Sequence, residues 1–320
     1  MPAHAGRLRP LERGIFSLVF GLMASFVVLV PFMATTARGH LLLTGPSVAA
    51  TQVPGGLNGS AVQAPTGRSP RIHGSSPARG QAPSPELLSS ALAGALRPVL
   101  GTDPGQLAVG VVDLNTGEAA TYNGGVVLRG GAIVTTDILA ALLLQHQQAG
   151  ARLSDHEAEL AANMVENGST MATSKLWTLI GGAPGLAAAN ATLKLRDTSL
   201  APGADWTWTK TTVGDQLQLL EDLAAPNSPL DSASRDYALG LMTSVSGPQP
   251  WGVQAAATTG TGAVADGSLL GPRWVIGSIG VIQRHGDELL VAVLSDHNPA
   301  EAPAVSAARA AVLAAATTVG

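Results

Sequence analysis

The chain has 320 residues, 46% of them hydrophobic and 12% charged, which is enough for one large domain with a sizeable core plus appendages. It contains no cysteine, so disulfides, thiolate metal sites and a lipid-modified cysteine are excluded. Residues 1–85 carry seven Arg and one Glu, a formal charge of +6, and residues 86–320 carry a formal charge of −10, which together give −4. The acidic residues 86–320 argue against a nucleic-acid partner.

The N-terminal segment predicts a membrane anchor. Residues 1–13 contain Arg7, Arg9 and Arg13, and residues 14–34 form an uncharged apolar run long enough to cross a bilayer. The preceding basic residues place 1–13 in the cytoplasm and the C-terminal domain outside, as a single-pass cell-membrane protein. The alternative is a secreted protein, with 14–34 removed as a signal peptide.

Residues 35–85 are predicted to form a flexible linker. They are rich in Pro, Gly, Ser, Ala and Gln, with only scattered Leu and Val. Such a composition cannot bury enough apolar surface to offset the conformational entropy that folding removes. We therefore expect a tether between the membrane and a domain at 86–320.

Residues 86–320 show a mixed pattern of helices and strands. Apolar spacing and capping signals predict helices at 86–96, 132–148, 154–166, 171–180, 185–193, 213–224, 231–242 and 304–316. Strands are predicted at 107–114, 119–123, 274–284 and 288–295. This order predicts an α+β domain in which an antiparallel sheet is flanked by the terminal helices, beside an all-helical lobe.

Seven short segments then give the domain a resemblance to a known superfamily. In chain order they are Val111 to Gly117, Asp137 to Leu143, Met164 to Asn167, Leu176-Trp177, Gly181-Gly182, Trp274 to Gly280 and Leu294 to Pro299. They resemble the serine β-lactamases and penicillin-binding proteins, most closely the class A β-lactamase-like proteins of actinobacteria. The resemblance covers residues 86–320 and implies a β-lactamase-like fold.

The resemblance also implies three motifs, S-x-x-K, S-D-N and K-T-G, around one pocket. Their positions align with Ala132 to Thr135, with Gly168-Ser169-Thr170 and with Thr258-Thr259-Gly260. The nucleophilic serine, both lysines and the second serine are therefore missing. No other register restores them, because residues 105–153 contain no serine and the chain has only three lysines, Lys175, Lys194 and Lys210.

A methyl group cannot attack a carbonyl, and a neutral threonine hydroxyl cannot replace a lysine. We therefore expect a protein without the superfamily's hydrolase chemistry that binds or scaffolds at the cell envelope, with peptidoglycan or a cell-wall protein as its partner. The alternatives are a hydrolase with a displaced serine or threonine nucleophile and a purely structural dimerising domain.

Few other residues are candidates for binding. Hydroxyls that the resemblance places near the pocket, and a Trp pair that could stack on a sugar, give the candidate set Ser169, Thr258, Thr259, Thr261, Trp206 and Trp208. The Trp pair has a competing interpretation as an anchor for its loop. The seven histidines show no metal-ligand spacing, so no metal and no cofactor are expected.

Overall fold

A computed structural model describes residues 83–100, 106–200, 203–245 and 251–319, all of which lie in one compact unit spanning residues 73–320. The predicted segments at 1–13 and 14–34, and residues 35–82 of the predicted linker, lie outside the described residues. Among the helices that are described, none is both long enough and apolar enough to cross a membrane.

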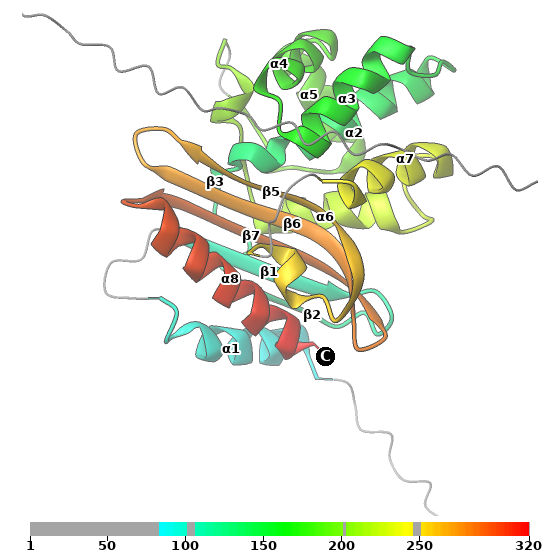
Figure 1. Cartoon of the computed structure of the whole chain (residues 1–320). Coiled ribbons are helices and arrows are strands. Elements are labelled where there is room, and N and C mark those ends of the chain that lie inside the picture. Colours follow the sequence, from blue (N-terminus) through cyan, green and yellow to red (C-terminus); the bar gives the residue numbers. More distant parts are fainter. Residues whose placement is uncertain (1–82, 101–105, 201–202, 246–250, 320) are drawn as a thin grey trace, which may run out of the picture. The chain divides into compact units, whose positions relative to one another are not determined.

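A five-stranded antiparallel sheet forms the centre of this unit, in the order β2-β1-β7-β6-β5 (Figure 1). Its strands are β1 (Gln106–Asp113), β2 (Ala119–Tyr122), β5 (Thr259–Leu270), β6 (Trp274–Arg284) and β7 (Asp287–Asn298). The predicted strands are present, and β5 is an additional edge strand. Its sequence, TGTGAVADGSLL, is rich in Gly and contains Asp, which are depleted in strands, so pairing with β6 rather than local propensity holds it extended.

The two terminal helices cover one face of the sheet (Figure 1). Helix α1 (Pro85–Leu96) buries Leu88, Leu92 and Leu96, and α8 (Glu301–Thr318) buries alanines at helical spacing, including Ala304, Ala308, Ala311 and Ala315. Small side chains allow α8 to lie close to the sheet, where it contacts β6 and β7. This layer is the predicted flanking of the sheet by the terminal helices.

The remaining helices form the predicted all-helical lobe. They are α2 (Val134–Gln148), α3 (Asp155–Asn167), α4 (Thr170–Leu179), α5 (Gly182–Leu193), α6 (Val213–Ala224) and α7 (Ser232–Thr243). Helix α2 is buried over most of its length, and α3 begins with the capping box that Ser154 and Glu157 predict. The α+β architecture expected from the sequence is confirmed.

A buried ion pair joins the main sheet to a second, two-stranded sheet, made of β3 (Leu128–Arg129) and β4 (Lys210–Thr211). Arg129 Nη2 lies 2.8 Å from Asp296 Oδ1 on β7, and Arg129 Nε donates to the same carboxylate. Arg129 Nη2 also donates to the Arg273 carbonyl, at 3.2 Å. This network fixes the segment that leads into α2.

Candidate functional site

Ala132 lies in a short 3-10 helix, Gly131–Ile133, directly before α2. The side chain of Ala132 is partly buried, and the Thr135 hydroxyl donates back to the Ala132 carbonyl, at 2.9 Å. A Cβ built on Gly267 of β5 would stand only 2.3 Å from the Cβ of Ala132. Strand β5 therefore runs directly against the start of α2, and only glycine fits there without movement.

Gly267 is therefore the β5 residue that lies against Ala132. The third motif, Thr258-Thr259-Gly260, was expected at this place, and that expectation is wrong. Thr258 precedes β5, so it lies at the end of the strand that is far from Gly267. Its hydroxyl accepts from the backbone N–H of His285, which follows β6, at 2.8 Å. Eight residues separate Thr259 from Gly267, or about 26 Å along an extended strand. The structure does not bring Thr258, Thr259, Gly260 or Thr261 to Ala132. The cause is the length of β5, which continues to Leu270.

The second motif position lies between α3 and α4. Gly168 ends α3 with a φ of 62°, and Thr170 is the exposed first residue of α4. Ser169 is the N-cap of α4, where its hydroxyl accepts from the Ala172 backbone N–H at 3.3 Å. The Ser169 hydroxyl therefore stabilises a helix end, and Gly168 lines the cavity described next.

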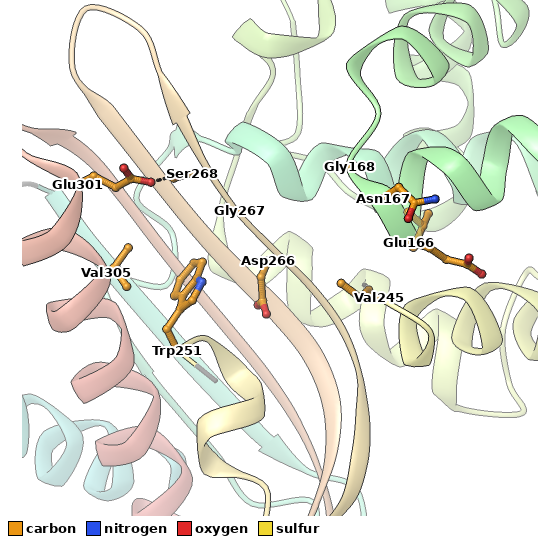
Figure 2. A pocket seen from close by; sticks show the side chains of 11 residues that line it. Glu166, Asn167, Gly168, Val245, Trp251, Asp266, Gly267, Ser268, Glu301 and Val305 are labelled. Carbon is orange, nitrogen blue, oxygen red and sulfur yellow. Dashed lines mark hydrogen bonds between the residues drawn. The ribbon is translucent and has the colours of Figure 1, made fainter. Parts of the chain in front are cut away.

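A cavity of about 280 Å³ lies between the end of α3, the edge strand β5 and the start of α8 (Figure 2). That volume is close to the lower limit of about 300 Å³ for small-molecule sites. Its polar side chains are Glu166, Asn167, Asp266, Ser268 and Glu301. Three of them are carboxylates, and none of the described residues that line the cavity is Lys, Arg or His. The cavity is therefore acidic.

Asp266 is held by a hydrogen bond from the neighbouring strand β6. Its Oδ1 accepts a hydrogen bond from the Ser278 hydroxyl, whose oxygen accepts in turn from the Val253 backbone N–H, at 2.7 Å. Its Oδ2 is buried and has no hydrogen-bond partner in the described part of the chain. Burial raises the pKa of Asp266 to about 6, although the Ser278 hydrogen bond acts in the opposite direction.

Ser268 lines the same cavity, and its hydroxyl donates to the Glu301 carboxylate at the first residue of α8 (Figure 2). Sequence reasoning named neither residue, nor Asp266. Alternation along β5 places Asp266 and Ser268 on one face and Gly267 on the other. If residues 259–270 had been predicted as a strand, the alternation of its side chains would have placed Asp266 and Ser268 on the same face. The Glu301 contact links residues 33 positions apart and has no local signal.

The two candidate tryptophans lie outside this cavity. Trp206 is buried, and its indole N–H donates to the Ser174 hydroxyl on α4, at 3.4 Å. This placement favours the interpretation of Trp206 as an anchor for its loop. Trp208 is 48% exposed and lies under the Arg129 guanidinium, 5.5 Å from the ring centroid. Its contact with Arg129 gives it a structural role.

Comparison with solved structures identifies the fold. PBP-A matches with a TM-score of 0.63 at 17% identity, over 72% of this chain and 96% of that one. A β-lactamase from Xanthomonas campestris pv. campestris matches with a TM-score of 0.61 at 18% identity, over 73% and 99%. An ancestral class A β-lactamase gives 0.59 at 22% identity, over 72% and 98%. No protein-family model and no curated protein matches the sequence.

Proposed function

The chain has the fold of the serine β-lactamases and penicillin-binding proteins, and from this premise we propose that it is a ligand-binding protein that does not hydrolyse its ligand. One observation carries the proposal: the start of α2 presents the methyl group of Ala132 where the resemblance expects a nucleophilic serine. A similar structure, of a point mutant of PBP-A, is an acyl-enzyme complex with penicillin G. An acyl-enzyme requires a nucleophile, which a methyl group cannot supply.

Ala132 does not line the cavity, and neither Thr135 beside it nor the described lining of the cavity supplies a lysine. The Thr135 hydroxyl is engaged with the Ala132 carbonyl, and Gly168 brings no side chain to the cavity. The described residues that line the cavity include neither lysine nor histidine, which are the usual bases for activating a hydroxyl. Loss of the nucleophile together with its proton-transfer partners removes activity by many orders of magnitude.

The cavity itself supports a binding role over a purely structural one. A packed dimerisation domain needs no open site, and an apolar, closed pocket around Ala132 would suit it. The observed cavity, which borders Gly267 but not Ala132, instead has five polar side chains on its wall, including a carboxylate with an oxygen that has no partner in the described residues. We propose that residues 14–34 anchor the domain outside the cell membrane, where peptidoglycan or a cell-wall protein is the expected partner.

A lactam-turnover assay tests the proposal. The full chain and the double variant Ala132→Ser/Thr135→Lys are both expected to hydrolyse a chromogenic cephalosporin no faster than buffer. Restoring two groups leaves Gly168 without a hydroxyl and leaves β5 without a lysine, so proton transfer and carboxylate binding stay defective. Circular dichroism confirms folding of each sample. Turnover by the double variant would show that these two groups suffice in this fold.

The Ser268–Glu301 hydrogen bond favours a second candidate, a hydrolase with a displaced nucleophile. A serine whose proton is accepted by a carboxylate is the minimum arrangement for nucleophilic attack. This candidate requires a covalent adduct on Ser268 that is lost in Ser268→Ala. The proposed binding function requires that Ser268 stay unmodified.

A further inference from the structure

We propose that the cavity between α3 and β5 binds an organic ammonium group and rejects carboxylate ligands. This inference names the ligand chemistry of the binding function proposed above and rests on it. It reverses the preference that the resemblance implies, in which a lysine holds the carboxylate of the substrate.

Asp266 lines the cavity, and one of its two carboxylate oxygens has no hydrogen-bond donor in the described residues. The Ser278 hydroxyl occupies Oδ1, and Oδ2 is buried without a donor in the described residues. A buried carboxylate oxygen without a donor costs free energy, which a ligand N–H group can recover. Asp266 therefore lacks a donor, and a cation supplies one together with a compensating charge.

The rest of the lining supports positive charge in the ligand. Glu166 on α3 and Glu301 on α8 also line the cavity, so it has two further carboxylates and no described lining cation to neutralise them. Negative charge on the walls of a cleft concentrates its potential and attracts cations. Trp251 lies beside Asp266 in Figure 2 and offers an aromatic face to an ammonium group. A carboxylate ligand would meet three carboxylates and no described cation in the lining.

Two observations select an ammonium group among cations. A guanidinium binds a carboxylate best through two parallel hydrogen bonds, and at Asp266 one of these would compete with the Ser278 hydroxyl for Oδ1. A single free oxygen suits the point charge of an ammonium group. A metal ion needs several ligands close together, and the described residues contain no group of three His, Cys, Asp or Glu side chains placed to hold one.

Isothermal titration calorimetry on the full chain in detergent tests the inference at pH 8. Pentylammonium serves as the free amine, Nα-acetyl-lysinamide as the amine on a peptide side chain, and pentanol and pentanoate as the neutral and anionic matches. Both amines are expected to bind, and pentanol at least tenfold more weakly, because the charge-assisted hydrogen bond is lost. Pentanoate is expected not to bind. The amine that binds more tightly identifies the source of the ammonium group.

Two variants test the residues. Asp266→Asn keeps an oxygen for the Ser278 hydrogen bond but removes the charge, so ammonium affinity is expected to fall at least tenfold. Glu301→Gln is expected to weaken binding less, because the Ser268 hydroxyl already donates to Glu301. Glu159→Gln is the matched control, since Glu159 is exposed on α3 and does not line the cavity. It is expected to leave the affinity unchanged.

The pH dependence gives a readout that does not depend on any variant. Burial raises the pKa of Asp266 to about 6, and Glu166 and Glu301 are the other titratable groups that line the cavity. Both amines stay charged below pH 8, so affinity is expected to fall about tenfold from pH 8 to pH 5 as Asp266 takes up a proton. Glu301→Gln is expected to keep this profile, and Asp266→Asn to lose it.

The results separate failure of this inference from failure of the proposed function. Pentanoate or pentanol binding as tightly as pentylammonium would overturn the ammonium preference while keeping a binding cavity. Equal affinity of the protein and Asp266→Asn would also overturn it. Absence of binding by all four probes would overturn it as well, whereas the proposed lack of hydrolysis fails only if lactam turnover or an adduct is found.

Discussion

Replacing Arg129 by methionine is expected to lower the free energy of unfolding by about 3–5 kcal/mol. The side chain is 10% exposed, and its Nε and Nη2 atoms both donate to Asp296, which is 3% exposed. Methionine keeps most of the volume but leaves the carboxylate buried without its cation. The hydrogen bond to the Arg273 carbonyl is lost in the same variant. Chemical denaturation of the two proteins measures the difference.

Two further variants show whether the effect comes from the unpaired charge. Arg152→Ala removes an exposed arginine and is expected to change stability by no more than about 0.5 kcal/mol. The double variant Arg129→Met/Asp296→Leu removes both charges and is expected to regain part of the loss, because leucine no longer accepts from the backbone N–H groups of Arg129 and His297. A double variant as unstable as Arg129→Met would show that the unpaired carboxylate is not the main cause of the loss.

The second large effect is expected at Asp137 in α2. Burial raises the pKa of Asp137 to about 7, although the side chain of Gln216 donates to both of its oxygens, at 3.2 and 3.3 Å. Between about pH 4 and pH 7 the folded protein therefore holds a proton that the unfolded chain has released. Stability is expected to fall as the pH rises through this window, by about 4 kcal/mol from this group alone.

Asp137→Asn removes this cost, because an amide does not ionise. It also adds an N–H donor near Gln216, whose Oε1 is buried without a partner in the described residues. At pH 8 the variant is expected to be more stable by about 2–4 kcal/mol, with little difference at pH 4. Denaturation at both pH values measures this, with Asp236→Asn on the exposed face of α7 as the control. Equal stability at pH 8 would show that Asp137 is ionised in the folded protein at little cost.

Much of the fold could be predicted from local sequence patterns. Helix α6 and strand β6 have the predicted bounds, because a Thr212 cap marks the start of the helix and a segment rich in Val and Ile marks the strand. Strand β5 could not be predicted in this way. Its glycines and Asp266 disfavour a strand locally, and β6 alone supplies the pairing that holds it. Such pairing depends on residues distant in the sequence.

For the candidate site, the sequence predicted which catalytic groups are missing but not which side chains line the cavity. The absence of a serine from residues 105–153 already excludes a nucleophile at the start of α2. The β5 residue that meets Ala132 is Gly267. The third motif was expected there, but its last residue, Gly260, lies seven positions earlier in the chain. Asp266 and Glu301 line the same cavity only because of the register of β5 against β6 and the position of α8. These are tertiary contacts without a motif.

Intact mass spectrometry of the full chain after incubation with benzylpenicillin tests the central claim most directly. A penicillin-reactive protein treated in parallel shows that the reagent is active, and circular dichroism shows that the chain is folded. An unchanged mass is predicted, because the Ala132 methyl group replaces the nucleophile. A mass increase of one penicillin would contradict the claim, and peptide mapping would then show whether Ser268 or another hydroxyl carries the adduct.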